Sequence, residues 1–186
     1  MSLGGLLFFK SQLLFYSLVF GCLCLVITPQ RSFAKVQLIF LSQKTASGEL
    51  VQFEKNGQFI HSAISFQNKW LQAHPYYGVQ LVSLSEVLKM GTDSQIMTLD
   101  DVPDLTESDI LPFLGKKFDR DYSWDDDRIY CSELLAKLLN IPPKPMFFDP
   151  KLWPAHYQKL NGEPGVSPDE IARYYLNKGY FLEENP

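Results

Sequence analysis

The chain has 186 residues, with three cysteines, three histidines and a formal net charge of −4. This length suits one domain built around a single hydrophobic core. The negative charge, together with the lack of a lysine or arginine run, argues against a nucleic-acid-binding surface.

The N-terminal segment has the pattern of a secretory signal peptide. Lys10 precedes an apolar run over residues 13–27, Thr28-Pro29 follows it, and Ser32-Phe33-Ala34 places small residues where signal peptidase cleaves. We expect cleavage after Ala34, which leaves residues 35–186 as a domain in the periplasm or outside the cell. The alternative is an uncleaved membrane anchor over residues 13–27, although a span needs about 20 apolar residues. Contact with a membrane is therefore expected only through this segment before cleavage.

Short strand patterns dominate the first half of the remaining chain. Residues 36–41 (VQLIFL) form an apolar run that fits either a strand or a helix. Turn residues such as Asn56-Gly57 and Gln67-Asn68 then separate segments of strand-like composition. These segments predict an antiparallel meander of four short strands over residues 49–53, 59–66, 69–73 and 79–84, the first two paired as a hairpin.

Helix signals follow in the second half. Ser83 with Glu86, Thr106, and Ser167-Pro168 with Glu170 are typical helix starts. They predict helices over residues 83–90, 106–117 and 167–177, and short strands are expected at most over 96–99 and 180–182. The proline- and aromatic-rich stretch 141–154 is expected to be a loop that forms one wall of a cleft, with Phe147, Phe148 and Trp153 as its apolar lining.

The stretch Ile129–Asn140 (IYCSELLAKLLN) places a cysteine where an extended segment turns into a helix. Leucines recur with helical spacing after Cys131, so the thiol is expected in the first helical turn, where the helix dipole favours thiolate. Cys22 and Cys24 are lost with the signal peptide, which leaves a lone thiol in an oxidising compartment. Such a thiol is an intermolecular disulfide partner, an inert buried side chain or a nucleophile.

A nucleophilic cysteine needs an imidazole to take its proton and a polar group to hold that imidazole. His61 is the best candidate for the base because it lies within a predicted strand. Gln72 lies one strand later in a register that places it near His61. His74 is a rival for the orienting role, although Pro75 directly after it indicates that the strand is ending.

Six segments occur in the order typical of a known family: GELVQF, FIHSAISF, WLQA, GVQLVSL, LGKKFDRDYSW and IYCSELL. Over residues 48–140 the chain resembles the YiiX/YebB-like proteins, circularly permuted members of the NlpC superfamily of papain-fold cysteine hydrolases. The permutation accounts for a histidine that precedes the cysteine. The resemblance implies an α+β, papain-like fold in which a small antiparallel sheet packs against the helix that carries the cysteine.

The resemblance also implies roles for individual residues. Cys131 is expected as the nucleophile and His61 as the general base, with Gln72 at the position of the family's third polar residue, often His or Glu. The backbone amide of Cys131 is a natural oxyanion donor, with Tyr130 or Ser132 expected nearby. Glu133 belongs to the family's signature, and the helix dipole is a sufficient reason for a carboxylate there.

The expected activity is hydrolysis of an amide bond, in a cell-wall peptide or a related substrate, through an acyl-enzyme on Cys131. The alternatives are a lipid acyl hydrolase or acyltransferase of the same superfamily and a non-catalytic binding module on this fold. No cofactor is expected, and no metal, since the sequence shows no spaced His/Cys cluster. The acidic run Asp125–Asp127 is expected to be a solvated loop, with a cation or a cationic substrate group as the alternative.

Overall fold

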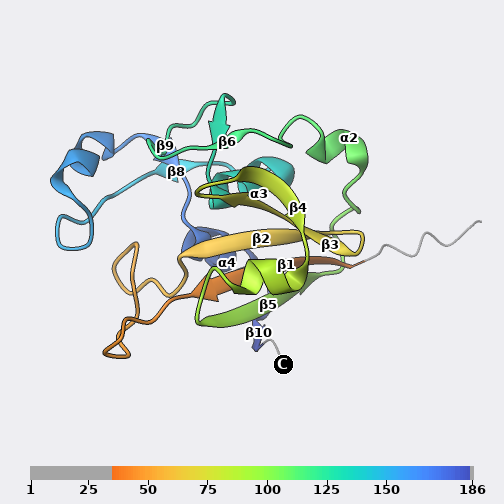
Figure 1. Cartoon of the computed structure of the whole chain (residues 1–186), viewed down its shortest axis with the longest axis horizontal. Helices are drawn as coiled ribbons and strands as arrows, with labels where there is room; N and C mark the ends of the chain where they lie inside the picture. The colour runs from red at the N-terminus through yellow and green to blue at the C-terminus, as the bar shows by residue number, and fades with distance from the viewer. Residues whose placement is uncertain (1–34, 185–186) are drawn as a thin grey trace, which may run out of the picture. The chain divides into compact units, whose positions relative to one another are not determined.

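The computed structural model describes residues 35–184, which form a mixed α/β domain around one six-stranded sheet (Figure 1). Its strands follow the order β10-β5-β1-β2-β3-β4, and all neighbouring strands are antiparallel. The strands are β1 (Val36–Ser42), β2 (His61–Phe66), β3 (Lys69–His74), β4 (Gly78–Val82), β5 (Asp93–Leu99) and β10 (Glu183–Glu184).

The apolar run that starts the described chain is a strand at the centre of this sheet. β1 pairs with β2 on one side and with β5 on the other. Leu38 and Phe40 pack into the larger hydrophobic core, while Ile39 and Leu41 pack into a smaller core on the opposite face. A strand covered on both faces has no polar side, which is why residues 36–41 show no alternation of apolar and polar residues.

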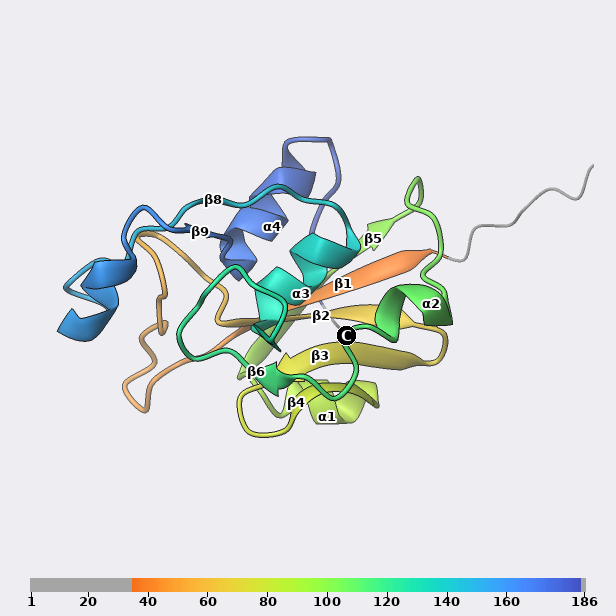
Figure 2. The same ribbon diagram turned by 90° about the horizontal axis from the view of Figure 1, so that it is seen from above.

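Helices cover both faces of the sheet (Figure 2). α3 (Cys131–Leu138) and α4 (Pro168–Leu176) pack against the larger core through Leu134, Leu135 and Ile171. α1 (Leu84–Leu88) covers the other face through Val87. The remaining elements are α2 (Glu107–Ile110), a 3-10 helix (Ala155–Leu160), the parallel pair β6 (Lys117–Phe118) and β7 (Arg128–Ile129), and the antiparallel pair β8 (Lys144–Pro145) and β9 (Pro164–Gly165).

The predicted α+β fold, with the cysteine helix packed on an antiparallel sheet, is confirmed. The predicted meander has four strands, but its first strand is β1 and not residues 49–53. Residues 49–53 lie in the long connection between β1 and β2, where the pairing is a single bridge between Lys44 and Leu50. The continuous apolar run buries more surface at the sheet centre than the short alternating segment does.

Other element boundaries also differ from the prediction. The helix predicted over residues 106–117 is only Glu107–Ile110, because Pro112 has no N–H to continue the helical bonding. The strand expected at 96–99 extends over the whole of β5, where it borders β1. The last strand lies at Glu183–Glu184 and not at 180–182.

The predicted signal peptide, residues 1–34, lies outside the described residues. Between residues 35 and 184, no helix combines the length and apolar character needed to cross a bilayer.

Candidate active site

Cys131 is the first residue of α3 and is buried. The short strand β7 leads into it, and Tyr130 is the N-cap of the helix. The Glu133 carboxylate accepts a hydrogen bond from the Tyr130 backbone N–H at 3.2 Å, which satisfies one of the free amides at the helix start. The predicted helix start at the cysteine is therefore present, and it fixes the direction in which the thiol leaves the backbone.

His61 is the first residue of β2, and its ring is held by the neighbouring strand. Nε2 of His61 lies 2.8 Å from Oε1 of Gln72 on β3, and both side chains are buried. Burial lowers the pKa of His61 from 6.5 to about 4, although the bond to Gln72 acts in the opposite direction. The imidazole is therefore neutral at physiological pH and able to accept a proton.

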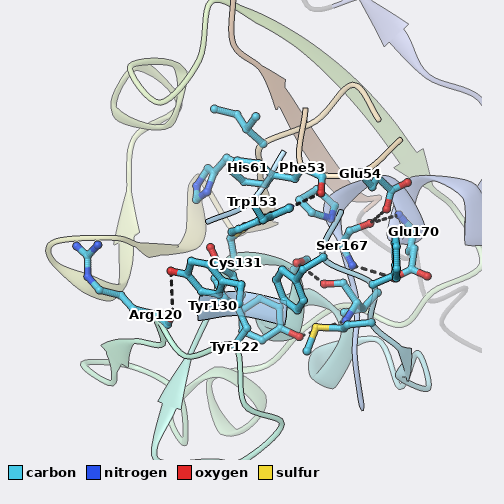
Figure 3. A pocket seen from close by; sticks show the side chains of 18 of the residues that line it. Phe53, Glu54, His61, Arg120, Tyr122, Tyr130, Cys131, Trp153, Ser167 and Glu170 are labelled. Carbon is cyan, nitrogen blue, oxygen red and sulfur yellow. Dashed lines mark hydrogen bonds between the residues drawn. The ribbon is translucent and has the colours of Figure 1, made fainter. Parts of the chain in front are cut away.

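Cys131 lies against the start of the strand that carries His61. The backbone amides of Ser62, the residue after His61, and of Ser132 stabilise the Cys131 thiolate, but burial outweighs them and raises the pKa of the thiol. Both Cys131 and His61 line one pocket (Figure 3). The dipole argument predicted a thiol that ionises easily, and that expectation is wrong for this structure because desolvation is the larger effect.

His74 is the last residue of β3, and its ring nitrogen is bonded within the turn that follows and not to His61. Its Nδ1 accepts from the backbone N–H groups of Tyr76 and Tyr77 at 3.1 and 3.3 Å. Its ring stacks on Tyr77 at 4.7 Å between centroids. His74 therefore stabilises the turn after β3. Of the two candidates for the orienting role, only Gln72 is hydrogen-bonded to His61.

Val166 contacts the two residues that flank Cys131. The Ser132 hydroxyl donates to the Val166 carbonyl at 2.7 Å, and the Val166 N–H donates to the Tyr130 hydroxyl at 3.2 Å. The Ser132 hydroxyl hydrogen is thus in use, so the donors at the helix start that remain for an oxyanion are backbone amides. Tyr130 and Ser132 line the pocket, as their expected place near the site requires.

Glu133, for which the sequence offered only a dipole argument, is fully buried one turn into the cysteine helix. Burial raises its pKa to about 7, partly offset by Lys137, whose Nζ lies 2.8 Å from Oε1. Lys137 also pairs with Asp126 at 2.8 Å. The bond between Lys137 and Asp126 therefore joins the cysteine helix to the acidic loop in front of it.

Apart from Asp126, which pairs with Lys137, the bonded acidic side chains just before the cysteine have their partners within residues 119–128. Asp119 is buried and accepts from the backbone N–H groups of Asp121 and Ser123, and Asp125 accepts from the Ser123 hydroxyl. Arg128 pairs with Asp121 at 2.7 Å. Between residues 35 and 184, no group of three or more His, Cys, Asp or Glu side chains is placed to hold a metal ion.

The pocket in front of Cys131 has a volume of about 500 Å³, and its lining is rich in aromatic residues. Trp153 lies at the centre of this lining, with ring centroids 5.0 Å from Phe53, Phe148 and Tyr157 and 5.5 Å from Tyr122. Its indole N–H donates to the Phe53 carbonyl at 2.6 Å.

We call Phe53, Tyr122, Phe148, Trp153 and Tyr157 the aromatic wall. Phe147, Phe148 and Trp153, expected from the sequence to line a cleft, all line this pocket.

Tyr122 is a site residue that sequence reasoning missed. Its backbone has a φ of +51°, which a bulky residue adopts only under constraint from its surroundings. Burial raises the pKa of its hydroxyl, and the nearby Cys131 adds to this shift. The only signal in the sequence was its position nine residues before the cysteine in the segment shared with the family.

A family model described as a permuted papain-like amidase enzyme, YaeF/YiiX, C92 family, matches residues 34–174. Among solved structures, the chain resembles one titled metalloprotein yiiX from Escherichia coli O157:H7, with a TM-score of 0.58 and 18% identity over 83% of this chain and 98% of that one. At this identity the structural likeness shows the fold alone. Among curated proteins, no sequence matches this chain.

The family match covers most of the chain, including the histidine strand, the cysteine helix and α4 up to Tyr174. It confirms the resemblance found in the sequence and the prediction of an enzyme over that of a non-catalytic module. The chain belongs to the YaeF/YiiX family of permuted papain-like cysteine amidases and peptidases.

Proposed function

We propose that this chain is an exported thiol amidase in which Cys131 is the nucleophile, His61 the base and Gln72 the residue that orients His61. The observation that carries the proposal is the bond between His61 Nε2 and Gln72 Oε1, beside a buried cysteine at a helix start. An amide oxygen only accepts, so Nε2 holds the ring hydrogen and Nδ1 keeps its lone pair for the thiol proton.

The proposed reaction has two steps. In the first, His61 takes the thiol proton as Cys131 Sγ bonds to the substrate carbonyl carbon, and the backbone amides at the start of α3 stabilise the oxyanion. The carbon–nitrogen bond then breaks, and the amine leaves with the proton from His61. In the second step His61 takes a proton from water as the water oxygen bonds to the thioester carbon. The carbon–sulfur bond then breaks, the carboxylic acid leaves, and His61 returns the proton to Cys131 Sγ.

The resting site favours general-base catalysis over a preformed ion pair. Burial raises the pKa of Cys131 and lowers that of His61, and both shifts favour the neutral thiol and the neutral imidazole. Proton transfer then accompanies nucleophilic attack.

The substrate expected from the resemblance is a cell-wall peptide or a related amide. A second candidate, a lipid acyl hydrolase or acyltransferase, is favoured by the aromatic wall, because an apolar lining of this size suits an acyl chain better than a polar peptide. We therefore place an amide with an apolar acyl part ahead of a stem peptide. The proposed location, the periplasm or the outside of the cell, rests on the sequence of residues 1–34.

The test is amine release from an N-decanoyl amide and from peptidoglycan stem peptides, with the acyl-enzyme trapped and identified by mass spectrometry. We expect release from the decanoyl amide, an acyl adduct on Cys131, and loss of both in Cys131→Ala. His61→Ala should lose activity by at least about 100-fold, a typical contribution of a general base. His156→Gln, an exposed histidine outside the pocket lining, is the matched control and should retain activity. An adduct on another residue would overturn the assignment of the nucleophile.

A further inference from the structure

The charged residues of the pocket lining are unevenly placed. Besides His61, the lining contains Glu54, Lys55, Arg120 and Glu170. Figure 3 shows Glu54 and Glu170 together on one side of Cys131 and Arg120 on the other. Lys55 follows Glu54 directly in the chain and is exposed. Arg120 is therefore the cation at the opposite end of the pocket.

The two carboxylates are occupied by structural bonds. Glu54 accepts from the Ser167 hydroxyl at 2.7 Å and is paired with Arg173. Glu170 accepts from the Ser167 backbone N–H at 3.0 Å and so caps α4. These bonds fix the start of the helix and engage both carboxylates.

Arg120 makes only neutral contacts within residues 35–184. Its Nη2 donates to the Pro75 carbonyl at 3.0 Å, and its guanidinium carbon lies 5.5 Å from the centre of the exposed Tyr76 ring. The carboxylates on either side of it in the chain, Asp119 and Asp121, both pair with Arg128. An arginine held over a pocket in this way keeps donors free for a planar anion.

Arg120 lies at the same end of the pocket as the groups next to the nucleophile. Its carbonyl accepts from the Tyr157 hydroxyl at 3.3 Å. Tyr122, two residues later, packs edge-on against Tyr130 at 5.2 Å, and Tyr130 directly precedes Cys131. Arg120 and Cys131 line the same pocket of about 500 Å³. A substrate that fills this pocket contacts both residues.

We infer that Arg120 binds an anionic group, a carboxylate or a phosphate, on the amine part of the substrate. The substrate class is then an amide that joins an apolar acyl chain, held on the aromatic wall, to a small acidic amine. This inference rests on the proposed amidase activity. Hydrolysis releases the acyl chain as a carboxylic acid after the thioester step, and the acidic amine leaves first with the proton carried by His61.

The test compares three amides that share one acyl chain, using the full-length protein. N-decanoylglycine carries a carboxylate, N-decanoylphosphoethanolamine carries a phosphate, and N-decanoylglycinamide is neutral. We expect kcat/KM for at least one anionic amide to exceed that for the neutral amide by about 10-fold or more, the size of one charge-assisted contact. The anionic amide with the larger kcat/KM shows whether the site prefers a carboxylate or a phosphate.

Variants at Arg120 then test whether this residue causes the preference for anionic amides. Arg120→Gln should reduce the ratio of anionic to neutral rates to within about twofold, and Arg120→Lys should restore part of it because the charge returns without the planar fork. Lys117→Gln removes a nearby positive charge that lies outside the pocket lining, and it should leave the ratio as in the wild type. Equal rates for all three amides, or a preference that persists in Arg120→Gln, would overturn the inference.

Binding separates this inference from the proposed function. If none of the amides is hydrolysed, the amidase proposal fails for this class. Calorimetric titration of Cys131→Ala with N-decanoylglycine and N-decanoylglycinamide then decides the role of Arg120 by itself. Tighter binding of the acid that disappears in the double variant with Arg120→Gln supports it, and equal binding of the two compounds contradicts it.

Discussion

Oε1 of Gln72 lies 2.8 Å from Nε2 of His61, so a neutral amide on the neighbouring strand determines which nitrogen of the imidazole is free. A carboxylate at this position would also raise the basicity of the ring, whereas a glutamine fixes the tautomer and adds no charge. The strength of His61 as a base is therefore limited mainly by burial.

Replacing Gln72 should separate orientation from basicity. Gln72→Leu leaves Nε2 without its partner, and we expect kcat to fall by about 10- to 100-fold with little change in KM. Gln72→Glu keeps an acceptor and adds a negative charge, so the acidic limb of the kcat/KM profile should move to higher pH as the pKa of His61 rises. Gln80→Leu, directly opposite Gln72 on β4, is the control. Full activity in Gln72→Leu would contradict the orienting role.

The pH dependence of alkylation should report a thiol that ionises late. Because burial raises the pKa of Cys131, its reaction with iodoacetamide should be slow at pH 6 and should reach half of its maximal rate above about pH 8.5. The measurement uses a chain with Cys22→Ser and Cys24→Ser, so that the signal comes from Cys131. Rapid alkylation at pH 6 that is lost in His61→Ala would instead demonstrate a thiolate–imidazolium pair.

Burial of neutral His61 should make the fold less stable in acid. The unfolded chain takes up a proton near pH 6.5 and the folded chain only near pH 4, so the free energy of unfolding should fall as the pH drops through this interval. The full loss is about 3 kcal/mol. Urea denaturation of the wild type and of His61→Leu at several pH values measures this contribution as their difference. A difference that does not change between pH 7 and pH 4 would rule out the buried neutral ring.

Lys137 should contribute to stability through Glu133. Its side chain is 15% exposed, and it pairs with the fully buried Glu133 and with Asp126. Lys137→Met leaves a buried carboxylate without its cation, and we expect a loss of about 3 kcal/mol in the free energy of unfolding at pH 8. Lys89→Met removes the exposed pair with Glu86 and should change stability by less than about 0.5 kcal/mol. If both variants lose a similar free energy of unfolding, the pair of Lys137 with Glu133 contributes no more to stability than an exposed ion pair.

Tyr122 should affect activity more than folding. Tyr122→Phe keeps the ring contacts with Tyr130 and Trp153 but removes a hydroxyl from the pocket that Cys131 also lines. We expect kcat/KM to fall by about 10-fold or more, consistent with the loss of one donor near the reacting atoms, with a nearly unchanged urea midpoint. Tyr174→Phe, on α4 outside the pocket lining, provides the comparison. A large change in the urea midpoint without a change in kcat/KM would make Tyr122 a structural residue.

Local signals in the sequence predicted the helix starts well. Ser167 caps α4 and Ser83 caps α1 because a cap depends on residues within one turn. Strand pairing is not local, which is why residues 49–53 were expected in the sheet while the strand or helix character of 36–41 stayed open. Alternation of apolar residues indicates which face of a strand is buried, but it does not specify which strands pair with it in the sheet.

The candidate site, like the fold, was predictable only in its local features. The resemblance placed Cys131 and His61 in one site, and the structure brings both to one pocket. The thiol's pKa was predicted in the wrong direction because the dipole is visible in a sequence and the depth of burial is not. Tyr122 and Arg120 were missed as pocket residues because their positions depend on the path of an irregular loop, which has no periodic pattern to read.

The contacts of Val166 mean that the site is completed by a residue far along the chain from both Cys131 and His61. Its N–H and carbonyl hold Tyr130 and Ser132 on either side of the thiol, across 36 and 34 residues of sequence. A fragment that ends before Val166 contains every residue of the proposed triad and lacks the backbone groups that hold the nucleophile's neighbours. The presence of Cys131, His61 and Gln72 in a truncated form is therefore not sufficient evidence that its site is intact.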